Sequence, residues 1–304
     1  MQIILLGTAA GGAVPQWNCW CPTCRTARAD PARVHPRSQS SVAVSPDGVR
    51  WFLINASPDV RQQLARLAGQ GPAGNGVRHV PIEAVVLTDA ELDHSLGIVL
   101  LREARTLAVY ATDATTRILE HDSRVLATTR AFATVSVSPL VADEPVPLRD
   151  RTGAPSGLTA EAFVVAGDAP RFATEESLGH TVGLMIRDTA TGGALAYVPG
   201  CGEIDEALAN RLRAADAVLF DGTFWQDDEL RALGISAISA REMGHVPISG
   251  SGGSLAMLAT LPARVRVYTH INNSNPILAE DSAARAAVNA AGVVVGDDGM
   301  TFTA

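Results

Sequence analysis

Apolar strands that run directly into helices recur in both halves of the chain, and this order limits the possible folds more than any other feature. In the first half, the apolar run 82–88 (IEAVVLT) precedes a predicted helix over 94–104. The second half has apolar runs at 217–222 (AVLFDG) and 264–269 (RVRVYT). Its predicted helices lie near 205–214, 253–261 and 279–291. Such strand–helix units favour sheets that are covered by helices.

Strand pairs joined by short turns accompany these units. The runs 41–45 (SVAVS) and 49–55 (VRWFLIN) flank Pro46-Asp47-Gly48, whose residue types suit a hairpin turn, and 181–199 predicts a second hairpin with a Gly-rich turn. Three further segments are a helix over 58–68, a flexible Gly-rich loop over 69–76 and a helix over 113–122 that Asp113 caps. Together the pattern predicts an α/β fold of αββα type, with two mixed β-sheets flanked by helices. No linker divides the chain, so we expect one domain over 1–304.

Composition and charge exclude several classes of partner. With 304 residues, of which 47% are hydrophobic, the chain can bury a sizeable core. The net charge of −8 argues against a nucleic-acid partner, which would need a basic face. The sequence has no recognisable signal peptide and no apolar stretch of about 18 residues. We therefore expect no membrane partner and a cytoplasmic location.

Three of the four cysteines lie within six residues, in the segment WNCWCPTC. Close spacing of Cys19, Cys21 and Cys24 favours thiolate coordination of one metal over a disulfide framework. A tetrahedral zinc would take these three ligands from a knuckle at 17–25 and a fourth from elsewhere in the chain. The alternative is a loop with free or redox-active cysteines. Cys201 stands alone and is expected to be a small core residue.

Two histidines follow apolar strands, where sheets commonly present ligands. His94 comes after Asp93 at a strand-to-helix junction, and His270 directly follows the strand 264–269. Asp93, His94 and His270 therefore form a candidate metal-binding group. His245, in a polar loop flanked by glycine, is equally well interpreted as a proton carrier, a substrate contact or an ordinary loop residue. The other histidines are His180, a weaker candidate, and the expected surface residues His35, His79 and His121.

Several segments together resemble the coenzyme PQQ synthesis protein B family, which belongs to the metallo-β-lactamase superfamily. The likeness covers essentially the whole chain. It is carried by LLGTAAGGAVPQWNCWCPTC, LINASPDV, LTDAELDHSLG, LFDGTFW, MGHVPISGSGG and YTHINNSNPI. The resemblance implies a role in pyrroloquinoline quinone (PQQ) biosynthesis, namely iron- and oxygen-dependent hydroxylation of the tyrosine ring of a Glu–Tyr unit derived from a precursor peptide. The implied partners are that unit, molecular oxygen and other enzymes of the same biosynthesis.

The metal-binding motif departs from that of the superfamily's hydrolases. Those enzymes bind two zinc ions with a His-x-His pair, a third histidine and a bridging aspartate. Here the pair is replaced by Asp89 and Glu91, and Gly200 occupies the position of the bridging aspartate. The remaining ligands are two histidines and one carboxylate, a set that holds Fe(II) and leaves coordination positions open. Zinc would also bind this set, which consists of Asp93, His94 and His270.

The resemblance and the local pattern assign further roles. Asp89 and Glu91 share a turn with Asp93 and are expected to ligate, to orient a ligand or to contact substrate. If that turn stays extended, Glu91 faces the metal together with Asp93. Asp221 is expected to orient a ligand histidine, and His245 to act as an acid–base group near the substrate ring. The alternative for Asp89 and Asp221 is an ordinary turn or capping aspartate.

Related enzymes with a cysteine knuckle imply that Asn273 lies at the position of the fourth zinc ligand. Asparagine is an unusual zinc ligand, so another group is the alternative. The carboxylates of a Glu–Tyr substrate would need cations in the protein. The candidates are Arg102, Arg105 and Arg241, and the alternative is that these are ordinary solvent-exposed surface residues.

Two other functions remain open at this level. One is a zinc-dependent hydrolase of the phosphodiesterase or lactonase type, which the missing His-x-His pair disfavours. The other is a non-catalytic protein that carries or releases PQQ.

Overall fold

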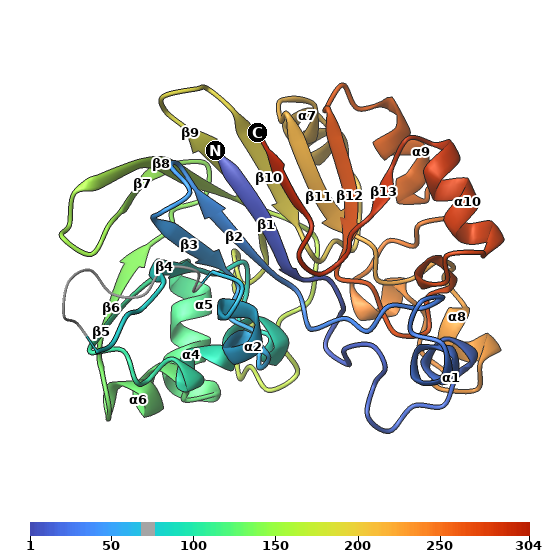
Figure 1. The fold of residues 1–304 in the computed structure, drawn as a ribbon, viewed down its shortest axis with the longest axis horizontal. Helices are drawn as coiled ribbons and strands as arrows, with labels where there is room; N and C mark the ends of the chain where they lie inside the picture. Colours follow the sequence, from blue (N-terminus) through green and yellow to red (C-terminus); the bar gives the residue numbers. More distant parts are fainter. Residues whose placement is uncertain (68–76) are drawn as a thin grey trace.

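The computed structural model describes residues 1–67 and 77–304, so the whole Gly-rich stretch 69–76, predicted to be a flexible loop, lies outside the described residues. Within the described part, two seven-stranded sheets stack face to face, with helices on their outer faces (Figure 1). The predicted αββα sandwich is therefore confirmed. None of the helices in the described residues is long and apolar enough to cross a membrane.

The strands form two sheets, in the orders β14-β1-β2-β3-β4-β5-β6 and β13-β12-β11-β10-β9-β8-β7. Their bounds are β1 Gln2–Gly7, β2 Ser41–Ser45, β3 Trp51–Ile54, β4 Ile82–Val86, β5 Thr106–Ala111, β6 Thr134–Pro139, β7 Pro145–Arg149, β8 Pro155–Val164, β9 Val182–Asp188, β10 Ala194–Val198, β11 Ala217–Asp221, β12 Val265–Thr269, β13 Val294–Val295 and β14 Thr301–Thr303.

The helices are short. Their bounds are α1 Pro22–Ala29, α2 Val60–Leu64, α3 Leu92–Ser95, α4 Gly97–Leu100, α5 Asp113–Arg117, α6 Val125–Arg130, α7 Glu206–Arg213, α8 Glu229–Ala232, α9 Ser254–Thr260 and α10 Ala283–Ala290, with a π-helical turn η1 Ile118–Asp122 and 3₁₀ turns η2 Arg241–Met243 and η3 Pro276–Leu278.

Each sheet is mixed, as predicted. β2 and β3 pair antiparallel, with Val42 opposite Ile54, and β9 pairs antiparallel with β10, so both predicted hairpins are confirmed. The strands β3 to β6 run parallel to one another, and so do β10 to β13. Buried parallel strands are apolar on both faces, which accounts for continuous apolar runs such as IEAVV.

Three apolar layers hold the sandwich together. The central layer lies between the sheets and includes Phe52, Leu184 and Tyr197, all with no more than a trace of exposed surface. The two outer layers pack each sheet against its helices, which are α2, α4, η1 and α6 on one side and α7, α9 and α10 on the other. Because each fully buried large apolar side chain contributes about 1.5–3 kcal/mol, these layers fix the strand ends that carry the polar residues.

Two helix predictions were wrong in detail. The helix expected over 94–104 is broken at Leu96 into α3 and α4, and a Cβ on Gly97 would lie 2.2 Å from the Ser57 carbonyl oxygen. The close approach of that loop therefore requires glycine. The cap of α5 is Thr112, whose hydroxyl accepts the Thr115 N–H, and Asp113 is instead the first helical residue.

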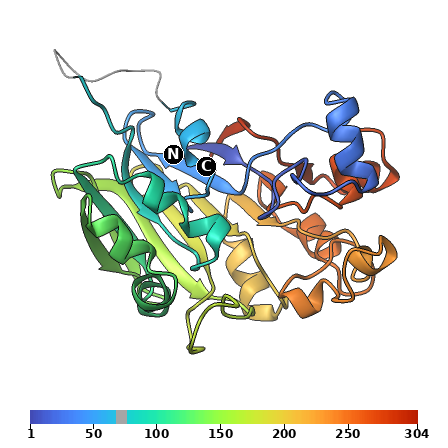
Figure 2. The same cartoon turned by 90° about the horizontal axis from the view of Figure 1, so that it is seen from below.

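Segments far apart in the sequence lie together at one end of the molecule. Figures 1 and 2 both show α1, coloured blue, among the orange and red elements of the second half. The segment 16–25 thereby comes close to the loop that follows β12, as a contact between Thr23 and Ser274 confirms. The two predicted metal sites both include residues of that loop.

Candidate metal centre

Asp93, His94 and His270 come from two different sheets. Asp93 and His94 lie in α3, which follows β4 of the first sheet, whereas His270 directly follows β12 of the second sheet. His270 has a φ of +54°, an uncommon backbone conformation for a residue other than glycine. Such outliers persist only where the surroundings fix them, and here the carbonyl and the ring of His270 both contact Thr223.

These three side chains present their donor atoms to one another. Asp93 Oδ2 lies 3.3 Å from His270 Nε2 and 3.9 Å from His94 Nε2. All three donor atoms lie within 4.8 Å of one another. One cation could therefore contact all three.

Asp89 holds the His94 ring. Both carboxylate oxygens of Asp89 lie 2.8–2.9 Å from His94 Nδ1. Because a carboxylate only accepts, Nδ1 carries the proton and Nε2 keeps its lone pair. His94 is 3% exposed, and its Nε2 is a buried atom without a hydrogen-bond partner in the described part of the chain. Such an atom is costly unless it binds something, so the donor set fits a metal ion.

Thr223 and Asp221 hold the second histidine. Thr223 Oγ1 donates to Asp221 Oδ1 over 2.6 Å and lies 2.8 Å from His270 Nδ1. With the Thr223 hydroxyl proton directed to Asp221, His270 Nδ1–H donates to Thr223, and Nε2 of His270 faces Asp93 Oδ2 at 3.3 Å. Thr223 was missed in the sequence. Its signal is the position two residues after Asp221, where its backbone N–H also bonds that carboxylate.

Asp221 also bonds His245, which was predicted to be an acid–base group, whereas Asp221 was expected to orient a ligand histidine. Asp221 Oδ2 lies 2.7 Å from His245 Nδ1, and the His245 ring stacks on His270 with centroids 5.5 Å apart. Asp221, His245 and His270 form a second group with donor atoms within 4.8 Å of one another. The pattern seen at the other two histidines is thus repeated, with Nδ1 bonded and Nε2 left for another partner.

The charges of these groups stabilise one another. Burial alone would lower the pKa of His94, but Asp89 and Asp93 outweigh it and raise the pKa to about 9. Burial would likewise raise the pKa of Asp93, yet His94 and His270 hold it far below its usual range. For His245, burial again opposes the charged form, and Asp221 raises the pKa. The cluster therefore favours a positive charge at the histidines, carried by protons or by a cation.

Glu91 does not face the metal-binding group together with Asp93, a position that was expected only if the turn stayed extended. The turn does not stay extended, because α3 begins at Leu92 and Glu91 is its N-cap residue. Glu91 is outside the group of Asp93, His94 and His270 and lines the adjoining cavity instead. Desolvation in that cavity, and the negative charges of Asp89 and Asp93, raise the pKa of Glu91 to about 7, although part of the side chain stays exposed.

A cavity of about 620 Å³ opens onto the metal-binding group. Its apolar wall includes Leu92, Phe172 and Phe224. Its carboxylates are Asp89, Glu91, Asp93, Asp168 and Glu242. Among the described lining residues, Arg171 is the one arginine or lysine. The expected substrate cations Arg102, Arg105 and Arg241 do not line this cavity, and Arg102 instead lies over the Phe132 ring.

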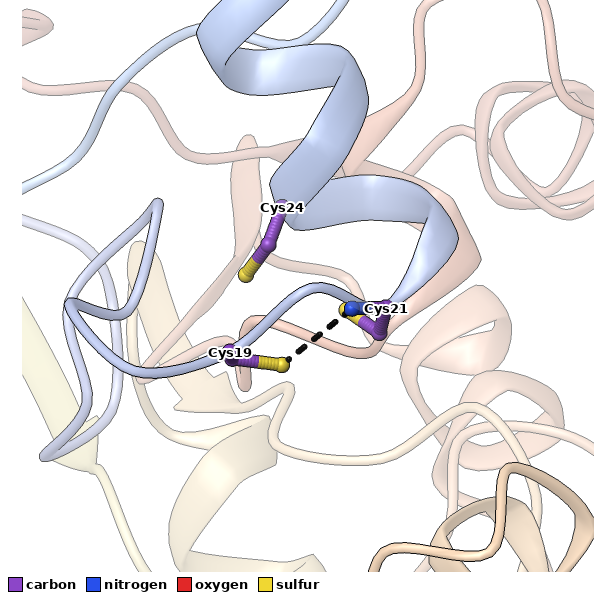
Figure 3. A group of neighbouring side chains, drawn as sticks. All are labelled: Cys19, Cys21 and Cys24. Carbon is purple, nitrogen blue, oxygen red and sulfur yellow. Dashed lines mark hydrogen bonds between the residues drawn. The ribbon is translucent and has the colours of Figure 1, made fainter.

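The three clustered cysteines form a separate group, shown in Figure 3, with their sulfur atoms directed toward a common space. Cys21 is the N-cap residue of α1, and Pro22 opens the helix. The backbone N–H of Cys21 donates to Cys19 Sγ over 3.5 Å. A helix start thus positions the sulfur atoms of Cys21 and Cys24 on one turn.

Asn273 lies beside these sulfur atoms, at the predicted position. Its side-chain amide is 3.2 Å from Cys24 Sγ and 3.8 Å from Cys21 Sγ. The hydrogen bond from Cys21 lowers the pKa of Cys24 to about 7, whereas Cys24 and burial raise that of Cys21. An amide has an oxygen and a nitrogen of nearly the same shape, so rotation of the group would present the oxygen to a metal.

The remaining candidates lie apart from both groups. Cys201 is fully buried, as expected for a core residue. His180 contacts the backbone oxygens of Ser177 and Gly167 and belongs to neither metal-binding group. The expected surface residues are His79 and His121, which are exposed, and His35, which is half-exposed and pairs with Asp297.

Comparison with known proteins finds a matching family model, a similar curated protein and similar solved structures. A family model described as a beta-lactamase superfamily domain matches residues 50–271. Coenzyme PQQ synthesis protein B of Methylobacterium nodulans is 48% identical and covers 99% of both chains. The crystal structure of Zn(II)-bound PqqB from Methylobacterium extorquens has 40% identity, a TM-score of 0.88 and 99% coverage of both chains. A diphosphatase of the PhnP family, 21% identical with a TM-score of 0.69 over 99% of this chain and 96% of its own, shares the fold.

Proposed function

Because this chain belongs to the coenzyme PQQ synthesis protein B family of the beta-lactamase superfamily, we propose that it acts in PQQ biosynthesis as an iron- and oxygen-dependent hydroxylase. Its substrate would be the tyrosine ring of a Glu–Tyr unit derived from a precursor peptide. The observation that carries this proposal is the group of Asp93, His94 and His270, with the buried, unpartnered Nε2 of His94.

Two histidines and one carboxylate would hold the metal. His94 and His270 would bind through Nε2, because Asp89 and Thr223 occupy their Nδ1 atoms. Asp93 would bind through a carboxylate oxygen. When bound, iron would supply redox chemistry toward oxygen, which zinc cannot do, at positions that these three ligands leave open.

The surroundings of this group do not favour a two-zinc hydrolase. Asp89, which replaces a superfamily ligand histidine, uses both oxygens on His94. Gly200 offers no side chain at the position of the bridging aspartate, and a Cβ there would lie 3.9 Å from His245 Cε1. A second metal ion would therefore lack most of its usual ligands.

The cavity has the chemistry for an aromatic amino-acid substrate. Leu92, Phe172 and Phe224 offer apolar surface to a phenol ring. Arg171 is placed to bind a substrate carboxylate, and the carboxylate of Asp168 is placed to bind an ammonium group. These contacts would orient the ring toward the metal-binding group.

His245 would serve as the proton carrier. Its Nδ1 is bonded to Asp221, so Nε2 is the atom left to take the phenol proton and to return it. Asp221 stabilises the resulting imidazolium, as the raised pKa of His245 indicates. Phe224 packs edge-on against the ring, with centroids 5.9 Å apart, and limits its rotation.

We also propose that Cys19, Cys21, Cys24 and Asn273 hold a structural zinc. Their convergence and the low pKa of Cys24 support this, because zinc binds thiolates. The metal would fasten the start of α1 to the loop after β12.

A zinc-dependent hydrolase is the second candidate. The solved relative carries zinc, and the three ligands of the catalytic group suit zinc as well as iron. One experiment separates the two functions. The protein is purified without oxygen, loaded with Fe(II) or Zn(II), and given a Glu–Tyr substrate and a chemical reductant, which supplies the two electrons that reduce the second oxygen atom to water. Air is then admitted, and mass spectrometry follows added oxygen.

We expect oxygen insertion with Fe(II) alone, and its loss in His94→Ala while the metal at the cysteines remains. His121→Ala, an exposed histidine outside both groups, is the matched control and should behave like the wild type. Hydrolysis of a phosphodiester by the zinc form, without any oxygen insertion by the iron form, would replace the hydroxylase with the hydrolase.

A further inference from the structure

The loop between β8 and β9 forms one side of the cavity at the metal-binding group. We call residues 166–181 the substrate loop, because Asp168 and Arg171, the two groups proposed to bind the charged ends of the substrate, both lie in it. Phe172, which offers apolar surface to the phenol ring, follows directly. The residues of this loop that line the cavity are Gly167, Asp168, Ala169, Arg171, Phe172 and Thr181.

The far part of the substrate loop is tied to helical elements of the first half of the chain. Asp122, in η1, accepts the Thr174 N–H over 3.2 Å and the Thr174 hydroxyl over 2.8 Å. Arg117, in α5, donates to the Glu175 carbonyl oxygen over 2.8 Å. These contacts hold the part of the loop that follows Arg171.

His180 joins the two ends of the substrate loop. Its Nε2 lies 3.0 Å from the carbonyl oxygen of Gly167, thirteen residues earlier in the chain. Its Nδ1 lies 2.5 Å from the carbonyl oxygen of Ser177. Because carbonyl oxygens only accept, each contact needs an N–H of the ring, and an imidazolium supplies both whereas a neutral ring supplies one. The bond to Gly167 closes the loop immediately before Asp168.

The other contacts at the base of the loop leave this task to His180. Regular pairing of β8 with β9 ends before the loop, and the Gly202 N–H holds the chain as far as Ala166. Beyond Ala166, Thr181 Oγ1 lies 3.5 Å from the Asp168 carbonyl oxygen, which is longer than the usual hydrogen-bond range of about 2.5–3.0 Å for a hydroxyl. The position of Asp168 therefore depends on the ring of His180.

We infer that His180 is a positioning residue for the proposed reaction. By bonding Gly167, it holds Asp168 and Arg171 where they meet the charged ends of the Glu–Tyr unit. His180 itself does not line the cavity and belongs to neither metal-binding group. This inference rests on the proposed function, and it names the residue that orders the substrate loop before binding. Such preorganisation raises affinity because less freedom is lost when the substrate binds.

Calorimetric titration of the Zn(II)-loaded protein with the Glu–Tyr unit tests this inference, because binding is then measured without oxygen chemistry. We expect His180→Ala to bind about five- to tenfold more weakly than the wild type, since the loop loses the bond that closes it. His180→Gln keeps an N–H donor near the position of Nε2 and should bind within about twofold of the wild type. His79→Ala, an exposed histidine outside the loop, is the matched control.

Two further measurements separate positioning from a general loss of structure. Hydrogen exchange followed by mass spectrometry should become faster within 166–181 in His180→Ala and stay unchanged elsewhere. Turnover by the Fe(II)-loaded variant, with the reductant present, should show a raised KM and a kcat within about twofold of the wild type. A fall in kcat together with loss of the catalytic metal would assign His180 to the metal-binding group and overturn the inference.

The remaining outcomes distinguish this inference from the proposed function. Equal affinities of wild type and His180→Ala overturn the inference alone, and so does a His180→Gln variant as weak as His180→Ala, because the donor would then be irrelevant. Failure of the wild type to bind the Glu–Tyr unit overturns the inference together with the substrate. Normal binding without oxygen insertion by the iron form refutes the hydroxylase and leaves the role of His180 to be decided by the affinities of its variants.

Discussion

The two proposed metal-binding groups of this protein are built in opposite ways. Cys19, Cys21 and Cys24 come from one short segment, and a helix start sets their spacing. Asp93 and His270 come from two sheets and are 177 residues apart in the sequence. The cysteines need only local structure and one distant amide to converge, whereas the catalytic group needs the whole sandwich.

The surroundings of the two groups differ in the same way. Each histidine of the catalytic group is held by a carboxylate, either directly, as with Asp89 and His94, or through Thr223, as with His270. The sulfur atoms contact mainly one another and Asn273. The catalytic group is thus oriented before any metal binds, while a metal would organise the cysteine group. Changes in the first should alter activity, and changes in the second should alter stability.

The largest effect is expected for Asp93→Asn. Removal of the charge that faces both Nε2 atoms should release the catalytic metal and lower oxygen insertion at least about 10³-fold, because a bound metal contributes several kcal/mol to the transition state. Metal analysis should show the cysteine metal unchanged. Activity within tenfold of wild type would mean that the carboxylate is not a ligand.

Cys24→Ser tests the other half of the comparison. Loss of one thiolate should release the cysteine metal and lower the Tm by about 5–10 °C, since a structural metal contributes to folding. Differential scanning calorimetry measures the change, and the catalytic metal content should remain. Cys201→Ala, a buried cysteine outside the group, serves as the control. An unchanged Tm in Cys24→Ser would argue for cysteines without a metal.

Glu229 lies near the cysteine group, because it accepts hydrogen bonds from Ser274, next to Asn273, and from the Trp225 N–H. Burial raises its pKa from 4.5 to about 7. The folded state therefore keeps a proton that the unfolded chain loses, and stability falls as pH rises from 4.5 to 7, by up to about 3 kcal/mol. Urea unfolding of Glu229→Gln should lack this decline. Parallel pH curves for variant and wild type would contradict it.

The smallest effect is expected for Asp89→Asn. An amide still reaches His94 Nδ1 but no longer supplies the charge that fixes its proton, so metal affinity should fall about 10–100-fold without loss of fold. Competition with a chelator measures the affinity. Asp47→Asn, which changes a carboxylate in the β2–β3 turn, should leave it unaltered. Equal affinities in the two variants would remove Asp89 from the site.

Much of the fold could be predicted because its strands are local apolar runs. The turn at Pro46-Asp47-Gly48 and the strand 82–86 are examples. The break at Leu96 could not, since it depends on the Ser57 carbonyl against Gly97, a contact between distant segments. That Thr112 rather than Asp113 caps α5 was also missed. Both residue types cap helices, and the sequence does not show which of two adjacent capping residues is the one used.

In the candidate site, too, residues marked by a local sequence pattern could be predicted, whereas residues placed by contacts between distant segments could not. His94, at the junction between a strand and a helix, and His270, directly after a strand, could be proposed because strand ends present ligands. Arg171 was missed, since its loop carries no periodic pattern and its distance to the site is set by the fold alone. Whether Glu91 faces the metal-binding group or lines the cavity depends on where α3 begins. The spacing of apolar residues in the sequence does not fix that start.

The open space at Gly200 bears on how this site could be converted into one for two metal ions. A Cβ there meets nothing nearer than 3.9 Å, so the first atom of a new side chain would fit. A two-metal arrangement like that of the superfamily's hydrolases is nevertheless several substitutions away, because Asp89 and Glu91 would both have to become histidine and His94 would lose its carboxylate partner. The dependence of His94 on Asp89, rather than lack of room, therefore opposes such a conversion.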